Sequence, residues 1–318
     1  MNFFEKNKKI AIITITSIIV VCFIIIFIIT DILLYKLIGL GRPVLYNSNP
    51  IYGYRPLPNK EYRRFWGSRI SFNNLSLRSE SNWDGIKHNK ILFLGDSVTY
   101  GGSYIDNSEL FSYLSVKKLN GNYISGNAGV NAWGVENVFG LIVESKFTPA
   151  KVYVSVFPEC DFYRGLTRLQ GLPFYNISPK YAIKELWHFF CYKQNNKRYL
   201  NWQSISNEKT NQIVVDKAVR KLKQMDTFLH EKGYNHIVFI TPSKNQLLNK
   251  DSIDQLIKQT ISNHQLNVNY ILDAINSNHK LTNEGINECY HDSIHLSKKG
   301  HQIWSEIICK KLKELLKS

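Results

Sequence analysis

The clearest structural signal in this chain of 318 residues is the stretch Ile91-Leu92-Phe93-Leu94-Gly95-Asp96-Ser97. Its apolar part is typical of a short strand that is covered on both faces of a parallel sheet. Ligand sites lie at the carboxyl ends of such strands, where Gly95 permits a tight turn. We therefore expect Ser97 to begin the next segment, where outward-pointing backbone N–H groups favour negative charge.

A second string near the C-terminus, Asp292-Ser293-Ile294-His295, supplies an acid and a base. Side chains three residues apart can meet in a turn, so Asp292 can hold one imidazole nitrogen of His295 while the other nitrogen faces Ser97. Each string alone would indicate only a helix cap or a turn, because Asp and Ser are common there. Together they predict Ser97 as nucleophile, His295 as general base and Asp292 as its orienting acid.

A metal site is the rival interpretation of the C-terminal string, with ligands at Cys289, His291, Asp292 and His295. His291 and His295 have the spacing that binds zinc when both lie on a helix. The flanking residues are typical of a loop, however, and the sequence lacks a His-Glu-x-x-His string. We therefore predict neither a metal nor another cofactor.

From Lys90 onward, apolar runs alternate with helical periodicity, which indicates a mostly parallel, five-stranded sheet between two helical layers. The predicted strands are Ile91–Leu94, Tyr123–Ser125, Val152–Phe157, His236–Thr241 and Tyr270–Asp273. The predicted helices are Glu109–Leu119, Val135–Glu144, Ile213–Lys232, Ile253–His264 and Lys298–Leu316. The aromatic, irregular residues 162–208 interrupt this rhythm and indicate an insertion, either a lid near the site or a satellite cluster under a long loop.

The first thirty residues form a separate element. Ile10–Ile29 is almost unbroken Ile, Val, Phe and Thr, and about 20 such residues match the thickness of a bilayer core. A cleavable signal peptide would have a shorter apolar region and a small-residue cleavage site, which the sequence around Asp31 lacks. Lys6, Lys8 and Lys9 precede the span, so the positive-inside rule places the N-terminus in the cytoplasm. The prediction is a single-pass protein of the cytoplasmic membrane with an extracytoplasmic domain.

These signals divide the chain into four predicted parts. Residues 1–9 are the cytoplasmic N-terminus, 10–30 the transmembrane anchor, 31–89 a stalk and lead-in segment, and 90–318 the main domain. The lead-in is rich in Pro, Asn, Tyr and Arg, which predicts extended or turning backbone with Arg69–Leu77 as its best strand candidate. The net charge of +15 is spread along the chain without a basic stripe among aromatics, so we predict no nucleic-acid partner.

Three blocks resemble the SGNH/GDSL hydrolase family: Ile91 to Thr99, then Asn127-Ala128-Gly129, and finally Asp292 to Leu296 with Gly300 following. They stand in the family's order, and the resemblance covers about residues 90–316. It implies a flavodoxin-like three-layer α/β/α fold with Ser97 as nucleophile, His295 as base and Asp292 as the triad acid. It also implies an oxyanion hole formed mostly by the backbone N–H groups of Ser97 and Gly129.

The third block departs from the family, which usually has Gly-x-Asn-Asp where this chain has Phe157-Pro158-Glu159-Cys160-Asp161. Cys160 stands in place of the asparagine, and a thiol is a poor hydrogen-bond donor. Losing one oxyanion donor costs about 10²–10³ in rate. Either another group substitutes, from the insertion or from Asn127 or Asn131, or the enzyme is slow.

Family members that are anchored in this way often act on acetyl or other acyl groups of envelope polysaccharides, so the resemblance implies a serine esterase or acyltransferase. Its partner would be an acylated, above all acetylated, carbohydrate of the cell envelope, and hydrolysis and transfer would share one acyl-enzyme. Two alternatives come from other classes. One is a catalytically silent glycan-binding or assembly protein with the same fold, and the other is a lysophospholipase or thioesterase.

Overall fold

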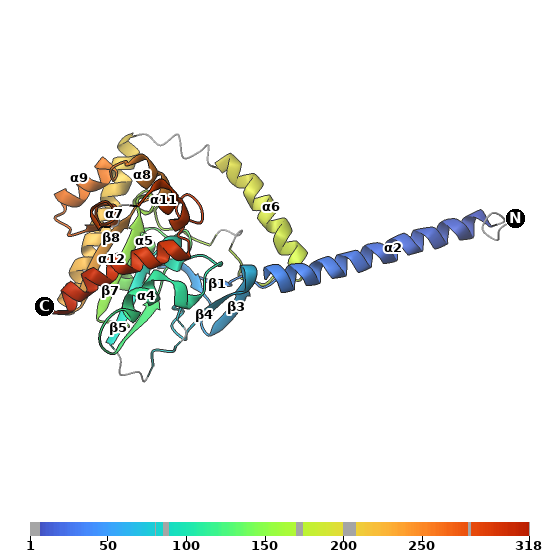
Figure 1. Cartoon of the computed structure of the whole chain (residues 1–318), viewed down its shortest axis with the longest axis horizontal. Coiled ribbons are helices and arrows are strands. Elements are labelled where there is room, and N and C mark those ends of the chain that lie inside the picture. The colour runs from blue at the N-terminus through green and yellow to red at the C-terminus, as the bar shows by residue number, and fades with distance from the viewer. Residues whose placement is uncertain are drawn as a thin grey trace.

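A parallel five-stranded sheet forms the centre of the main domain (Figure 1). The structure is a computed structural model that describes residues 7–79, 81–84, 89–169, 174–199, 208–278 and 281–317. The strands are β5 (Asn89–Gly95), β6 (Tyr123–Asn127), β7 (Val152–Pro158), β8 (Asn235–Thr241) and β9 (Asn269–Tyr270). Their order is β6-β5-β7-β8-β9, and every neighbouring pair is parallel. This is the flavodoxin-like order that the sequence predicts.

The two central strands are apolar and fully covered. Residues 91–94 of β5 and all seven residues of β7 are buried, as near-continuous apolar runs predict for strands with helices on both faces. The chain passes from β5 to β6 on one side and later enters β7 on the other side of β5. The carboxyl ends of β5 and β7 therefore flank the topological switch point, where ligands bind in sheets of this kind.

Two helical layers enclose the sheet, which makes the fold a three-layer α/β/α sandwich (Figure 1). One layer pairs α4 (Phe111–Lys117) with α12 (Lys298–Lys317), and the other contains α5 (Val135–Phe139), α7 (Glu208–Glu231) and α9 (Gln255–Asn263). All five lie where the sequence predicts helices. In α7, Leu222, Met225 and Leu229 are fully buried, which is the period of a helix with one apolar face.

The prediction of the last strand, Tyr270–Asp273, is wrong in its extent. The strand β9 ends at Tyr270, and the helix α10 (Ile271–Asn278) begins at the next residue. Ile271 and Ile275, four residues apart, are buried on one face of this helix. A short apolar run fits either a covered strand or the buried face of a helix, so periodicity alone does not separate them. Other short elements are α3 (Ser97–Tyr100), η3 (Asn107–Glu109), η4 (Gly140–Glu144), η5 (Glu159–Phe162), α8 (Lys244–Asn249) and α11 (Asn283–Cys289).

The lead-in before the sheet is more regular than the sequence indicates. Two antiparallel hairpins pair β1 (Tyr46–Asn49) with β2 (Gly53–Pro56) and β3 (Lys60–Arg64) with β4 (Ser68–Phe72). Strands of four or five residues are too short to show a clear period, and β1 and β2 also include Asn or Pro. Bridges from Phe72 to Arg78 and from Arg78 to Asn127 join the second hairpin to β6. The lead-in therefore packs on the main domain.

The N-terminal helix α2 (Lys8–Leu33) extends away from the domain, and none of its residues is buried (Figure 1). With the π-helical turn η1 (Leu34–Ile38) it forms the one helix of the described chain that is long and apolar enough to cross a membrane, with a mean hydropathy of 3.3 over an 18-residue stretch. The apolar helix therefore extends beyond the predicted anchor of residues 10–30, as far as the first residues of the lead-in.

The predicted insertion contains one long helix, α6 (Ala182–Tyr199), which begins beside the end of α2 (Figure 1). Glu185 of α6 forms a buried ion pair with Arg64 of β3 at 2.5 Å, and its second carboxylate oxygen accepts the N–H of Gly41 at 2.5 Å. These contacts tie the helical part of the insertion to the lead-in. The five cysteines all lie in the described chain and are free.

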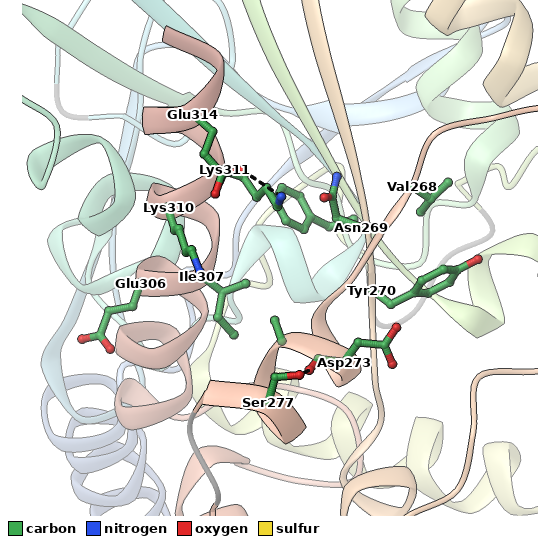
Figure 2. Close-up of a pocket in the computed structure, with 12 residues that line it drawn as sticks. Val268, Asn269, Tyr270, Asp273, Ser277, Glu306, Ile307, Lys310, Lys311 and Glu314 are labelled. Carbon is green, nitrogen blue, oxygen red and sulfur yellow. Dashed lines mark hydrogen bonds and ion pairs between the residues drawn. The ribbon is translucent and has the colours of Figure 1, made fainter. Parts of the chain in front are cut away.

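A groove of about 620 Å³ opens beside β9, between α10 and α12 (Figure 2). Its walls include Val268, Tyr270 and Ile307, together with the ion pair of Lys311 and Glu314. The strands β7 and β8 separate β9 from β5. The groove thus lies at one edge of the sheet and away from the switch point.

Gly95 is the tightest point of the turn between β5 and α3. Its φ is +153°, and a Cβ there would stand 2.3 Å from the carbonyl oxygen of Val156 and 2.4 Å from Thr99 Oγ1. We predict that Gly95→Ala lowers the free energy of unfolding by about 2–4 kcal/mol, because backbone strain and overpacking add. Urea denaturation of the full chain in detergent measures this loss.

The matched control is Gly233→Ala. Gly233 also has a positive φ, of +72°, but a Cβ there would meet nothing within 4 Å. Its substitution should cost only the backbone strain, about 1 kcal/mol. Equal losses in the two variants would contradict the close packing of the turn against β7.

Candidate active site

Ser97 stands at the carboxyl end of β5, where the sequence predicts it. The strand ends at Gly95 and α3 begins at Ser97, with Asp96 between them as the N-cap. The carboxylate of Asp96 accepts the N–H of Val98 at 2.8 Å, the hydrogen bond that starts a helix. Asp96 is buried whereas Ser97 is partly exposed. The turn thus presents the hydroxyl and holds the acid beneath it.

The structure brings Ser97, His295 and Asp292 together. His295 Nε2 lies 2.9 Å from Ser97 Oγ, and His295 Nδ1 lies 2.7 Å from Asp292 Oδ2. The other carboxylate oxygen of Asp292 accepts the backbone N–H groups of Ile294 and His295 at 2.9 and 2.8 Å. This local turn holds the acid against the imidazole. The arrangement is that of a nucleophile, a base and a group that orients the base.

Charges within the group favour the protonated imidazole. Burial alone would lower the pKa of His295, but the hydrogen bond to Asp292 and the charge of that residue raise it above its ordinary value. Burial alone would raise the pKa of Asp292, but hydrogen bonds from His295 and Ile294 hold it well below its usual range. Asp292 is therefore ionised at neutral pH, which keeps the proton of neutral His295 on Nδ1 and leaves Nε2 to accept.

The raised pKa of His295 provides a pH test. Only the neutral imidazole accepts the serine proton, so we predict that kcat/KM for a soluble ester falls as the pH drops through that pKa. Asp292→Asn removes the charge that raises the pKa, so the acidic limb moves to lower pH while kcat falls about 10⁴-fold. Asp251→Asn, at an exposed position, is the control and leaves the limb in place. A limb that stays unmoved in Asp292→Asn would contradict the coupling.

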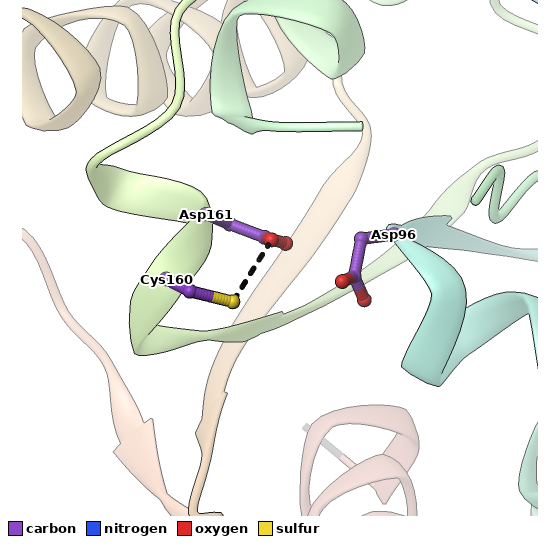
Figure 3. A group of neighbouring side chains, drawn as sticks. All are labelled: Asp96, Cys160 and Asp161. Atoms are coloured by element: carbon purple, nitrogen blue, oxygen red, sulfur yellow. Dashed lines mark hydrogen bonds between the residues drawn. The ribbon is translucent and has the colours of Figure 1, made fainter. Parts of the chain in front are cut away.

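The loop after β7 carries the altered third block. Cys160 and Asp161 lie in the short helical turn η5, next to Asp96 at the end of β5 (Figure 3). Burial, and then the charge of Asp161, raise the pKa of the Cys160 thiol, so the thiol stays neutral. The thiol donates to Asp161 Oδ1, which lies 3.8 Å from the sulfur. This contact argues against Cys160 as a donor to an oxyanion.

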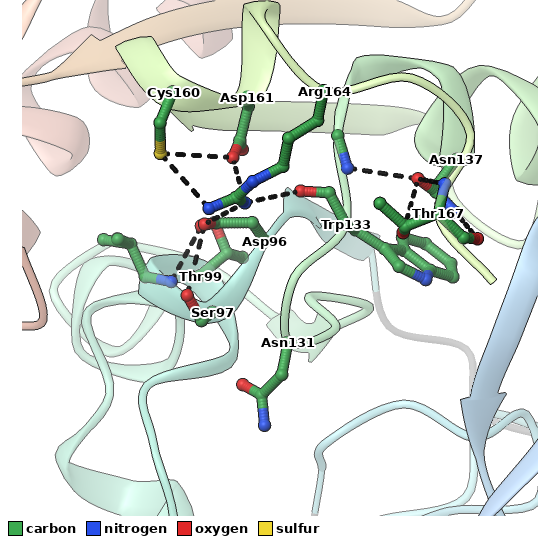
Figure 4. Close-up of polar contacts among 12 residues, drawn as sticks. Asp96, Ser97, Thr99, Asn131, Trp133, Asn137, Cys160, Asp161, Arg164 and Thr167 are labelled. Carbon is green, nitrogen blue, oxygen red and sulfur yellow. Dashed lines mark hydrogen bonds and ion pairs between the residues drawn. The ribbon is translucent and has the colours of Figure 1, made fainter. Parts of the chain in front are cut away.

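Arg164, the third residue of the predicted insertion, joins the same group (Figure 4). Its Nη1 lies 2.7 Å from Asp161 Oδ1 and 3.3 Å from Asp96 Oδ2, and its Nη2 donates to Cys160 Sγ at 3.4 Å. Asp96 Oδ2 in turn lies 3.2 Å from Ser97 Oγ. One cation therefore contacts two buried carboxylates directly behind the candidate nucleophile. The sequence interpretation did not include this residue.

Asp161 is fully buried, and its Oδ2 has no hydrogen-bond partner in the described chain. Burial and the charge of Asp96 raise the pKa of Asp161 well above its ordinary value, although Arg164 opposes the shift. The neutral form of Asp161 is therefore favoured more than it would be at an exposed position.

The polar atoms of Asp96, Cys160 and Asp161 lie within 4.8 Å of one another, which is also a spacing compatible with a metal ion (Figure 3). Arg164 contacts all three side chains. A metal ion entering here would meet a guanidinium, so these residues do not fit a cation site.

The two histidines of the alternative metal site near the C-terminus, His291 and His295, contact other side chains. Both ring nitrogens of His295 are engaged, one by Asp292 and the other by Ser97. His291 instead stacks on Tyr104, with ring centroids 4.0 Å apart. The two histidines therefore serve different contacts.

Two of the predicted oxyanion donors are occupied within the fold. The N–H of Gly129 donates to Asn127 Oδ1 at 2.8 Å, and Asn127 Nδ2 donates to Thr99 O at 2.5 Å and Ser112 Oγ at 3.0 Å. A Cβ on Gly129 would stand 2.4 Å from the backbone nitrogen of Tyr100, so this glycine serves the close approach of its loop to α3. These bonds argue against an oxyanion role for either residue.

Another residue of the same loop has an unusual backbone conformation. Ala132 has a left-handed φ of +60°, which is uncommon for a residue with a side chain and is a form of strain found at functional sites. It is partly exposed, and its N–H has no partner among the residues that the structure describes. Asn131 donates its amide to the hydroxyl of Tyr46 at 3.3 Å. The sequence does not predict Ala132 as a site residue, because nothing in the residues around it indicates a positive φ.

Arg164 supplies the charge opposite the buried Asp96. We predict that Arg164→Met lowers the free energy of unfolding by about 3 kcal/mol, because removing one partner leaves an uncompensated buried charge. Arg220→Met is the control: Arg220 pairs with Asp216 at an exposed position, so its loss costs less than about 1 kcal/mol. Urea denaturation of the two variants in detergent compares them. Equal costs would contradict the role of Arg164 as the counter-charge.

Comparison with known proteins finds similarity at the level of structure. No family model and no curated protein matches the sequence. The lipase/acylhydrolase from Enterococcus faecalis is 15% identical with a TM-score of 0.41, over 71% of this chain and 96% of that chain. A member of the lipolytic protein G-D-S-L family from Veillonella parvula is 10% identical with a TM-score of 0.37, over 70% and 96%. A carbohydrate acetylesterase from Sinorhizobium meliloti is 12% identical with a TM-score of 0.39, over 71% and 99%. At these values, function has to be argued from the site itself.

Proposed function

We propose that this chain is a serine esterase or O-acyltransferase of the SGNH type, which works through an acyl-enzyme. The observation that carries the proposal is the continuous contact from Asp292 through His295 to Ser97, at 2.7 and 2.9 Å. Both distances are within reach for proton transfer. The position of a partly exposed Ser97 at the switch point of the sheet supports the same conclusion.

In the acylation step, His295 Nε2 takes the proton of Ser97 Oγ as that oxygen bonds to the carbonyl carbon of the ester. The carbonyl electron pair moves onto its oxygen, which gives a tetrahedral oxyanion beside an imidazolium that Asp292 stabilises. The carbonyl then reforms, the bond to the leaving alcohol breaks, and His295 gives its proton to that alcohol. Water or a sugar hydroxyl attacks the acyl-Ser97 ester by the same sequence, which completes hydrolysis or transfer.

We assign the oxyanion to the backbone N–H groups of Ser97 and Ala132. Ser97 is the first residue of α3, where N–H groups have no partner within the helix. Ala132 offers an N–H without a partner in the described chain, and Arg164 holds the adjacent Trp133 carbonyl at 3.0 Å. Arg164 is thus a positioning residue for the loop that carries Ala132. This pair of donors does not require the asparagine that Cys160 replaces.

The chain is proposed to be a single-pass protein of the cytoplasmic membrane, with α2 as its anchor, the N-terminus in the cytoplasm and the catalytic domain outside. The length and apolarity of α2 support anchorage, and Lys8 and Lys9 before the apolar run support the orientation. The proposed substrate is an acylated, above all acetylated, carbohydrate of the cell envelope. The rings of Tyr104 and His291 are stacked, and His291 directly precedes Asp292 in the chain. These rings offer a flat surface on which a sugar ring can pack.

Two other functions have some support. Cys160, whose thiol donates to Asp161, favours a catalytically silent glycan-binding protein. A fluorophosphonate probe distinguishes a silent protein from an active esterase, because the probe labels Ser97 only where its hydroxyl is activated. The apolar helix α2 favours a lysophospholipase or thioesterase, and comparing kcat/KM for acetyl and long-chain esters separates those.

The esterase proposal predicts large losses from single substitutions. Ser97→Ala and His295→Ala should each lower kcat for a model acetyl ester by about 10⁴–10⁶-fold, because the nucleophile or its base is removed. Acetate release by the full chain in detergent is the measurement. Ser293→Ala and His230→Ala replace exposed residues of the same kinds and should leave the rate within about 2-fold of the parent. Activity retained in Ser97→Ala or in His295→Ala would overturn the assignment.

A further inference from the structure

The helix α6 is fixed to the domain by one face. Glu185 pairs with Arg64, and Phe189, one turn later, packs against Phe65 with ring centroids 6.1 Å apart. His188 lies on the same side, because residues three and four apart share one face of a helix. These contacts hold α6 against the β3–β4 hairpin.

The opposite face of α6 carries large apolar side chains that the described chain leaves uncovered. Leu186, Trp187 and Phe190 are 47%, 61% and 54% exposed. The rings of Trp187 and Phe190 stack on each other, with centroids 5.7 Å apart. Single exposed apolar residues are common, but several adjacent ones on one helix face mark an interaction surface.

The start of α6 touches α2 inside its apolar run. The rings of Phe27 and Tyr181 have centroids 5.6 Å apart, and Asp31 Oδ1 accepts the N–H of Ile183 at 2.9 Å. Phe27 precedes Asp31 by one helical turn, about 6 Å along the axis. A bilayer that surrounds α2 as far as Phe27 therefore also reaches Tyr181, and α6 leaves α2 at the membrane surface.

Further exposed aromatic and apolar side chains gather at the same point. Trp66, in the turn η2 (Phe65–Gly67) at the tip of the β3–β4 hairpin, is 79% exposed and has a φ of +59°. Such a backbone is costly for a bulky residue, and no packing inside the domain explains this side chain. The turn η1, which contacts η2, exposes Tyr35 and Leu37. Trp and Tyr are the residues enriched at membrane–water interfaces.

We propose that the outer face of α6 and the tip at Trp66 lie in the interface of the bilayer that α2 spans. The inference rests on the proposed membrane anchorage. Leu186, Trp187 and Phe190 then enter the boundary of the acyl chains, while the exposed Lys184 and Lys193 meet anionic headgroups. A single helix leaves the domain free to rotate and tilt. This second contact fixes the orientation of the active site to the membrane surface.

The test uses tryptophan fluorescence of the full chain in nanodiscs made with brominated or ordinary phosphatidylcholine and phosphatidylglycerol. Brominated acyl chains quench only tryptophans that reach them. We expect the parent chain to be quenched and the double variant Trp66→Phe/Trp187→Phe to lose most of the quenched emission. In Leu186→Glu/Phe190→Glu, the emission of Trp187 should escape the quencher, because two charges on this face oppose its insertion.

Ile213→Glu is the matched control, because Ile213 is 61% exposed on α7 and should leave the quenching unchanged. Hydrolysis of a soluble ester confirms that each variant is folded. Quenched emission that persists in both double variants, or a parent chain without quenching, overturns the proposal. Flotation of the full chain with vesicles tests α2 separately, so a chain that floats without quenching leaves the anchor intact and refutes only the contact of α6.

Discussion

The close packing of the β5–α3 turn against β7 is the constraint on which the site depends. Gly95 has no Cβ, which lets the Val156 carbonyl approach the turn and accept the hydroxyl of Thr99 at 3.1 Å. Because the turn packs so closely against β7, Asp96 is buried, and groups of the protein have to donate the hydrogen bonds to its carboxylate. The N–H of Val98, the hydroxyl of Ser97 and the guanidinium of Arg164 are such donors. The position of the serine and the need for a nearby cation therefore follow from one strand pairing.

His295, the proposed base, lies on a second turn that backbone contacts hold in place. Tyr290 and Leu296 form a bridge that closes the loop around His295, and the N–H of Ser297 donates to the Cys289 carbonyl at 2.9 Å. Gly300 admits that same carbonyl, since a Cβ there would stand 2.1 Å from it. Each half of the proposed triad is thus fixed by its own backbone contacts. Preorganisation of this kind limits the rearrangement that the reaction requires.

The sequence predicts those parts of the molecule whose geometry depends on residues that are close together in the chain. Ser97, Asp292 and His295 lie in short strings where the residue types and their spacing already imply the geometry, and the buried strands show their own apolar runs. The contact of Arg164 with Asp96 depends on the approach of two loops that are far apart in the sequence. An arginine three residues after Asp161 therefore does not indicate Asp96 as its partner. The helix α6 was not predicted because both of its faces carry aromatic residues, which removes the amphipathic period.

Polar contacts connect the point where α2 ends to Ser97, the proposed nucleophile. Glu185 of α6 holds both the N–H of Gly41 and the guanidinium of Arg64 in β3. The same hairpin leads through the bridge at Phe72 to Arg78, whose Nη1 donates to the carbonyl of Tyr100 at 2.6 Å. Tyr100 is the last residue of the short helix that Ser97 begins. Because each of these groups is buried and would lose its partner if the lead-in moved, the direction in which α2 leaves the domain and the direction that Ser97 faces are set together.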